Sequence, residues 1–183
     1  TTVKRNYVKE IQDYYEEHNA KSVIIDFKHR KNKDERINAR IKDYEQFLRT
    51  TAMNLKNAGS PYHLIALGPT ITCTLKTYIA VGGMSSKPAT EDFYFLQSLH
   101  KYDAVHMIPK VLVEPSSRQS DRVYLGTGFR MKQLSEGMDI QNIYYDVSAY
   151  NLLSKWLDFA TQAYNAKLED VLKYVRNIHE KLP

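Results

Sequence analysis

The sequence predicts an α/β fold in which a mixed sheet is flanked by helices, with a helical extension at the C-terminal end. Short β-branched runs alternate with amphipathic segments of helical period through the first two thirds of the chain, which favours helices layered on a sheet. The last third keeps the helical period throughout. The 183 residues, 43% of them hydrophobic, can bury one well-packed core without the help of disulfide bonds.

The spacing of apolar residues and the turn residues between them define the individual elements. In chain order, the prediction is a helix over residues 3–17, a strand over 22–27, a helix over 37–57, strands over 62–68 and 70–81, a helix over 91–102, a strand over 110–115, a strand and loop over 121–129, and a helical tail over 150–182. Gly59 is expected to end the second helix with a left-handed cap, and Gly82 with Gly83 to break the segment before them.

The tail suggests a division of the chain. We expect residues 1–149 to form the α/β part and residues 150–183 to form a helical tail that packs on it or is used for association. An apolar stripe of this kind is most often core packing. A seam between copies of the chain and a helix lying on a membrane surface are the alternatives.

Charge and cysteine content narrow the function classes. The net charge of +5 favours anionic partners such as nucleotides and phosphates. The basic cluster over residues 28–36 is interrupted by two acids, so we interpret it as a solvated loop and expect no nucleic-acid partner. One cysteine excludes a disulfide framework and fits a cytoplasmic location. No run approaches the roughly 18 apolar residues of a membrane span.

Two adjacent acids, Glu91 and Asp92, stand between a Gly/Ser/Pro-rich loop and an aromatic-rich helical pattern. One interpretation is helix capping, in which Thr90 accepts from free backbone N–H groups and the acids complement the helix dipole. The other is chemistry, because a placed carboxylate can serve as a general base.

Two further stretches contain residues suited to a site. Asp26 and Lys28 form an Asp-x-Lys element of the kind found in metal-dependent PD-(D/E)xK nucleases, with Asp13 upstream as the second acid. Solvated charges at a strand edge are the competing interpretation of that element. The run over residues 116–131 places Arg118, Arg122 and Arg130 around a Gly-Thr-Gly loop. Guanidinium groups beside flexible backbone suit a diphosphate, although Arg–Asp pairs could equally fasten a loop.

Three stretches, read in order, carry a resemblance to a known family. They are AGSPYHLIALGPTITCTLKTYIAVGGM (58–84), ATEDFYFLQSLHKY (89–102) and VEPSSRQSDRVYLGTGF (113–129). As an ordered set they resemble the later half of the catalytic domain of family 2 glycosyltransferases, which have the GT-A fold. The similar features are a "GGm" turn, an "xED" motif that opens a helix and, as in one bacterial subgroup, an "S-x-R-x-SDRV-x-x-GTG" segment. The similarity runs from about Asn6 to Phe129.

The resemblance implies transfer of a sugar from a nucleotide-sugar donor to an acceptor hydroxyl with inversion. It makes Asp92 the catalytic base, with Glu91 beside it holding acceptor hydroxyls or the geometry of the motif. Arg118 and Arg122 would contact substrate or diphosphate, and Gly82 and Gly83 would let the backbone approach the donor sugar. The acceptor would be a glycan or a lipid-linked molecule.

The family also has an Asp-x-Asp motif and a nucleotide-binding half, and neither is present in these residues. The resemblance therefore implies a partial GT-A-like sheet that belongs to a longer enzyme and is inactive alone. A divalent metal, Mg²⁺ or Mn²⁺, is expected in the intact enzyme, with ligands mostly outside this chain. Contact with the inner face of a membrane and homo-oligomers formed through the C-terminal helices are further expectations. A non-catalytic module that docks an acidic partner is the alternative from another class.

Overall fold

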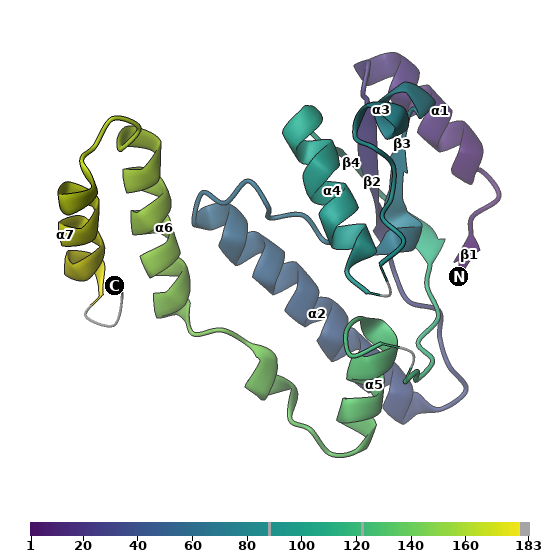
Figure 1. The fold of residues 1–183 in the computed structure, drawn as a ribbon. Helices are drawn as coiled ribbons and strands as arrows, with labels where there is room; N and C mark the ends of the chain where they lie inside the picture. The colour runs from purple at the N-terminus through teal and green to yellow at the C-terminus, as the bar shows by residue number, and fades with distance from the viewer. Residues whose placement is uncertain (88, 122, 180–183) are drawn as a thin grey trace. The chain divides into compact units, whose positions relative to one another are not determined.

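The computed structural model describes residues 1–87, 89–121 and 123–179, which form a mixed α/β protein (Figure 1). In chain order the elements are β1 (Thr2–Val3), α1 (Tyr7–His18), β2 (Ser22–Phe27), α2 (Glu35–Asn57), the 3₁₀ turn η1 (Gly68–Thr70), β3 (Ile71–Cys73), α3 (Leu75–Ala80), α4 (Glu91–Tyr102), β4 (His106–Glu114), α5 (Thr127–Ser135), the 3₁₀ turn η2 (Ile140–Ile143), α6 (Val147–Gln162) and α7 (Leu168–Ile178).

The sheet has the order β1-β4-β2-β3 and is mixed, as the sequence predicts. Strand β4 runs parallel to β2, whereas β1 and β3 pair antiparallel with their neighbours. The central strand β2 is the predicted SVIIDF segment, and Val23 and Ile25 on one face are as completely buried as Ser22 on the other. A strand buried on both faces needs cover from both sides, which explains its nearly continuous apolar run.

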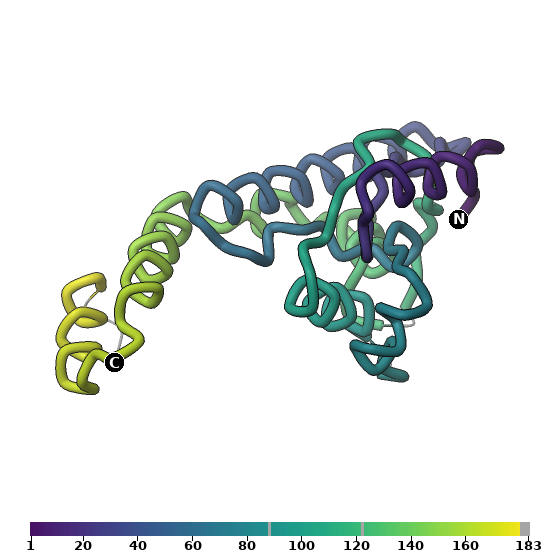
Figure 2. Tube along the Cα trace, turned by 90° about the horizontal axis from the view of Figure 1, so that it is seen from above, coloured from purple at the N-terminus to yellow at the C-terminus, as the bar shows by residue number. Residues whose placement is uncertain are grey.

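Helices provide that cover. Figures 1 and 2 show α1 and α4 on opposite sides of β2. Helix α1 is tied to the sheet by the hydroxyl of Tyr15, which lies 3.1 Å from that of Thr72 on β3. Helix α4 buries Phe95, Leu96 and Leu99 at helical spacing, so one face of it belongs to the core.

The predicted strands between α2 and α4 are largely wrong. Residues 62–67 contain no strand, and the segment 70–81 is a strand only over Ile71–Cys73 before it turns into helix α3. The cause is at Thr74, whose hydroxyl accepts a hydrogen bond from the backbone N of Thr77 at 3.2 Å and so caps α3. Local capping therefore prevails over the β-branched composition of this segment.

Other boundaries also differ from the prediction. Strand β4 begins at His106 rather than at residue 110, and α2 begins at Glu35 rather than at residue 37. The first helix begins at Tyr7 rather than at residue 3, because Thr2 and Val3 pair with β4. Within the predicted strand and loop over 121–129, the described residues contain no strand, and α5 begins at Thr127. The tail is not one continuous helix, because residues 163–167 separate α6 from α7, and its last residues lie outside the described part.

The chain forms two compact units. The first contains residues 1–46 and 66–142 and includes the sheet, and the second contains residues 47–65 and 143–183. In the second unit the tail helices are joined by a segment from the middle of the chain, which the division at residue 149 does not include. Within that unit α6 and α7 pack together, with the rings of Phe159 and Tyr174 stacked 3.9 Å apart.

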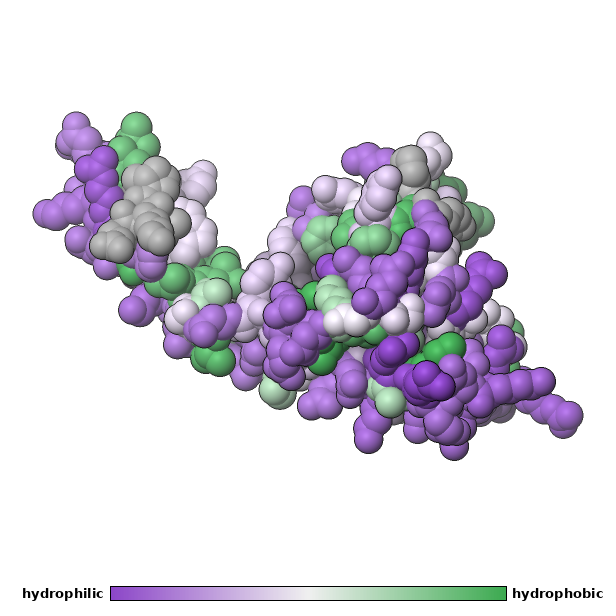
Figure 3. All heavy atoms as spheres, turned by 90° about the horizontal axis from the view of Figure 1, so that it is seen from below, coloured by the Kyte–Doolittle hydropathy of each residue, from purple (hydrophilic) through white to green (hydrophobic). Residues whose placement is uncertain are grey.

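On the face drawn in Figure 3 most side chains are hydrophilic, with apolar ones between them. In the part of the chain that the structure describes, no helix combines the length and the apolar character that crossing a bilayer requires.

Candidate functional site

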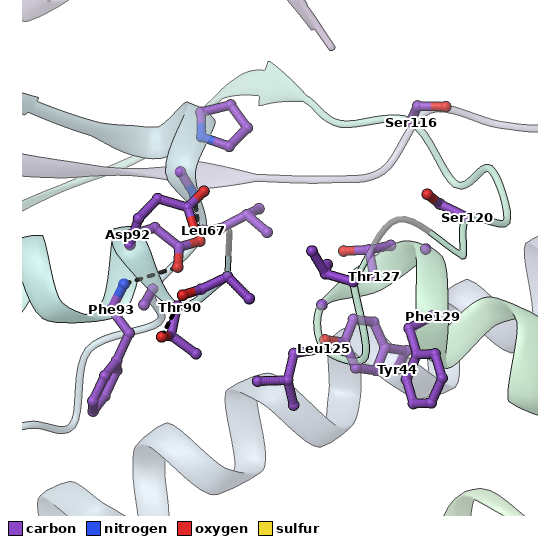
Figure 4. A pocket seen from close by; sticks show the side chains of 18 of the residues that line it. Tyr44, Leu67, Thr90, Asp92, Phe93, Ser116, Ser120, Leu125, Thr127 and Phe129 are labelled. Carbon is purple, nitrogen blue, oxygen red and sulfur yellow. Dashed lines mark hydrogen bonds between the residues drawn. The ribbon is translucent and has the colours of Figure 1, made fainter. Parts of the chain in front are cut away.

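A cavity of about 470 Å³ opens in the first unit between two loops that each lead into a helix. One wall is formed by residues 66–69 and 89–93, where α4 begins, and the other by Ser116, Arg118, Ser120, Val123 and residues 125–129, where α5 begins (Figure 4). Tyr44 of α2 also lines it. A cavity of this size accommodates a small organic ligand such as a sugar.

The first turn of α4 departs from ordinary helix capping. Thr90 stands at the N-cap position with φ of 66° and ψ of 8°, which is the left-handed region. That region is strained for a β-branched residue. The Thr90 hydroxyl donates to the carbonyl of Ala89 at 2.5 Å and makes no cap. The interpretation in which Thr90 caps the helix is therefore wrong, and the strain lies beside the cavity.

The carboxylate of Asp92 lies in the cavity wall and is held by two backbone groups. Its Oδ1 accepts from the N of Phe93 at 2.8 Å, and its Oδ2 accepts from the N of Gly68 at 3.2 Å (Figure 4). Burial raises the pKa of Asp92 and the charge of Glu91 raises it further, while both backbone hydrogen bonds oppose the shift. A half-buried carboxyl that resists ionisation and opens on a cavity is typical of a group used in chemistry.

Of the other predicted site residues, the structure brings Glu91 and Arg118 to the cavity. Arg118 is exposed on the opposite wall from Asp92. Arg122 lies outside the described residues.

The structure does not bring Gly82 and Gly83 to the cavity lining. They follow α3, where the N of Gly83 donates to the carbonyl of Tyr78 at 2.8 Å and the N of Gly82 donates to that of Ile79 at 3.1 Å. Both glycines have positive φ, at 78° and 72°. This pair of bonds is the Schellman arrangement that ends a helix, which accounts for the glycines without a ligand.

Sequence reasoning missed Tyr44 and Thr127 as residues of the cavity wall. Burial raises the pKa of the Tyr44 phenol, the guanidinium of Arg130 opposes that shift, and the carboxylate of Asp92 adds to it. No short-range pattern connects Tyr44 with residues 89–93, so only the fold reveals it. The sequence did offer a clue to Thr127 as a cavity residue, since it is the central residue of the Gly-Thr-Gly loop.

The second wall depends on a close backbone contact. A side chain added at Gly128 would place its Cβ 2.6 Å from the Cβ of Ser120, and the N of Ser120 donates to the carbonyl of Gly128 at 3.2 Å. Only glycine fits such an approach. Gly128 therefore fixes the loop that carries Ser116, Arg118 and Ser120 against the start of α5.

The acids of the predicted nuclease site do not line this cavity. Asp13 is on α1, where it forms an ion pair with Lys9 at 3.4 Å, and Asp26 is on β2, where its Oδ1 accepts from the N of Phe27. Across residues 1–87, 89–121 and 123–179, no group of three or more His, Cys, Asp or Glu side chains is arranged to hold a metal ion.

Comparisons with known proteins give no relative for this chain: no family model, no curated protein and no solved structure matches it.

Proposed function

We propose that this chain forms the acceptor side of an inverting glycosyltransferase of the GT-A kind, in which Asp92 is the general base. The observation that carries the proposal is the half-buried Asp92 carboxylate, with its raised pKa, in the wall of a cavity of sugar size. The family resemblance of residues 58–84, 89–102 and 113–129 supports the same residue as base.

The mechanism follows from the position of the carboxylate. A hydroxyl of the acceptor gives its proton to Asp92 while its oxygen bonds to the anomeric carbon of the donor sugar. The bond from that carbon to the diphosphate breaks on the opposite side, so the configuration inverts. A raised pKa makes the ionised carboxylate a stronger base, and a positioned base contributes about 10²–10⁴ in rate.

Neighbouring groups serve this step. Glu91 is the second acid of the motif, and its charge raises the pKa of Asp92, which strengthens the base. Arg118 is assigned to the diphosphate or to another acidic group of the substrate, because its guanidinium is exposed at the cavity. Arg122 has the same proposed assignment, without a structural argument.

The divalent cation of the family has no fitting site among the residues described. Near the cavity the carboxylates are those of Glu91 and Asp92, and the described residues contain no group of three or more His, Cys, Asp or Glu side chains that could hold a metal ion. We therefore assign the cation to ligands outside the described residues.

The test is a transfer assay on the longest natural protein that contains this chain, with a panel of nucleotide sugars and glycan or lipid-linked acceptors. Release of nucleoside diphosphate that depends on acceptor should appear for one donor. Asp92→Asn should lower that rate by about 10²–10⁴ while circular dichroism shows an intact fold. The matched control is Asp103→Asn at the other end of α4, where the acid is exposed and pairs with Lys21 at 2.8 Å. Full transfer by Asp92→Asn would refute the assignment.

A docking module is the second candidate, because apolar side chains are exposed on α3. Leu75 and Ile79 are 74% and 69% exposed and lie one helical turn apart. Under this candidate, Asp92→Asn leaves the biological activity intact and Leu75→Ser with Ile79→Ser removes it, whereas the transferase predicts the loss at Asp92.

A further inference from the structure

A buried histidine lies directly behind the second wall of the cavity. His29 follows β2, its side chain is fully buried, and its ring meets that of Phe27 edge-on at 5.6 Å. Its Nδ1 lies 2.7 Å from Oε1 of Glu45 on α2, and its Nε2 lies 3.4 Å from the hydroxyl of Thr127. Glu45, His29 and Thr127 thus form a chain of contacts that passes through the buried His29 and ends at the cavity.

The direction of the hydrogen bonds in this chain can be assigned. Oε1 of Glu45 also accepts the backbone N–H of His29 at 2.5 Å. An ionised carboxylate has no proton to donate, so the ring proton in the contact with Oε1 is assigned to Nδ1 of His29. In a neutral imidazole the other nitrogen, Nε2, is then an acceptor, and the hydroxyl of Thr127 is the only donor in this contact.

We propose that Thr127 binds the substrate as a hydrogen-bond acceptor, because the buried His29, held by Glu45, takes the hydrogen bond of the Thr127 hydroxyl and leaves its lone pairs to the cavity. Thr127 is the group that touches the ligand, and His29 and Glu45 are positioning residues. A threonine held in this way favours a ligand hydroxyl and disfavours a phosphate or carboxylate oxygen at the same place, since two acceptors repel.

The inference rests on the proposed function for the class of ligand, and it specifies that class further. The ionised Asp92 on one wall and Thr127 on the other both accept hydrogen bonds, and Figure 4 shows them on opposite sides of the cavity. A neutral polyol offers donors to both walls at once. The acceptor substrate is therefore assigned to neutral sugars or polyols, and an acidic group of the substrate is directed elsewhere, toward Arg118.

Two measurements test this on the whole chain. Long-range ¹H–¹⁵N spectra of the histidine rings should show His29 with a proton on Nδ1 and none on Nε2. Glu45→Leu, which removes the acceptor for Nδ1, should change that pattern, whereas Glu45→Gln, which keeps an acceptor oxygen, should preserve it. Ligand-observed NMR should detect binding of at least one of a panel of methyl hexopyranosides, more tightly than the corresponding uronate or sugar phosphate. Thr127→Val, which keeps the shape, should weaken this binding about tenfold, the loss expected for one hydrogen bond left unmade.

Thr127→Ser should restore binding to within about twofold of wild type, since it keeps the hydroxyl. The control is Thr161→Val in the second unit, whose hydroxyl donates to the carbonyl of Asp158 at 2.8 Å. A protonated Nε2 in the free protein, equal binding by Thr127→Val, preference for the anionic probes, or no neutral probe bound at tens of millimolar would each overturn the inference. Failure of sugar transfer with these binding results intact would reject the proposed function alone.

Discussion

The first turns of helices α4 and α6 differ in how an acidic side chain is used beside the free backbone N–H groups. At α6 the N-cap is Asp146 in extended conformation, and its Oδ1 accepts from the N of Ser148 at 2.8 Å. The hydrogen bonds from Ser148 lower the pKa of Asp146, so the charge is stabilised. At α4 the N-cap is the strained Thr90, which makes no cap, and burial raises the pKa of Asp92. The start of α6 serves helix stability, and the start of α4 departs from local stability beside a cavity, where functional groups concentrate.

The largest difference should appear in catalysis. Asp92→Glu keeps the charge but moves the carboxylate by one methylene, and such a displacement should lower sugar transfer about 10²-fold. Asp146→Glu should leave transfer within about twofold, because its carboxylate only caps a helix. Steady-state rates of both variants in the transfer assay give the comparison. Equal effects of the two substitutions would mean that Asp92 is a cap like Asp146.

The strain at Thr90 predicts a stabilising substitution. Thr90→Gly adopts a φ of 66° without steric conflict, so the free energy of unfolding should rise by about 1 kcal/mol. Urea denaturation measures it. The same change should reduce transfer, because the wall beside Asp92 loses a fixed side chain. A loss of stability on this substitution would show that the conformation of Thr90 is not strained.

Removing the cap at Asp146 should lower stability, in contrast to the substitution at Thr90. Asp146→Ala removes the acceptor for the N of Ser148, and the melting temperature should fall by about 2–5 °C. Asp146→Asn, which keeps an acceptor oxygen, should lose less. Thermal melts followed by circular dichroism compare the two variants, and an unchanged melting temperature for Asp146→Ala would argue that the cap contributes nothing.

The smallest effect concerns pH. The folded state binds the proton of Asp92 more tightly than the unfolded chain, so the ionised group destabilises the fold at neutral pH. That penalty disappears as the pH falls through the raised pKa. Asp92→Asn should therefore have a higher melting temperature than wild type at pH 7, and this difference should disappear in acid.

The pKa of Asp146 is lowered, so its charge stabilises the fold, and this stabilisation is lost as the pH falls through the lowered value. Wild type should therefore have a higher melting temperature than Asp146→Asn at pH 7.

Elements that satisfy themselves locally could be predicted from the sequence. Helix α4 spans the predicted residues 91–102. Gly59 ends α2 with φ of 79°, where the N of Ser60 donates to the carbonyl of Leu55 and the N of Gly59 to that of Lys56. In each case the signal and the structure lie within a few residues of one another, because helix and cap hydrogen bonds close locally.

Strands were less predictable, because a strand pairs with a segment that is distant in the sequence, and the local sequence does not identify that segment. Residues 62–67 have the composition of a strand, yet β3 pairs with β2 at Ile71–Cys73, and only three residues do so. The sequence pattern placed Val3 in the first helix, whereas pairing of Thr2 and Val3 with Glu114 and Val113 makes this segment the strand β1.

The sequence by itself determined that Asp92 opens a helix after a Gly/Ser/Pro-rich loop, and that the chain is α/β with helices at its end. Only the tertiary structure decided that Asp92 shares a cavity with Tyr44, Arg118 and Thr127, and that His29 lies behind that wall. The physical reason is how far apart in the sequence the interacting residues lie. Helix starts and caps depend on hydrogen bonds between near neighbours, whereas a cavity and the desolvation of its carboxylate depend on segments brought together by the sheet.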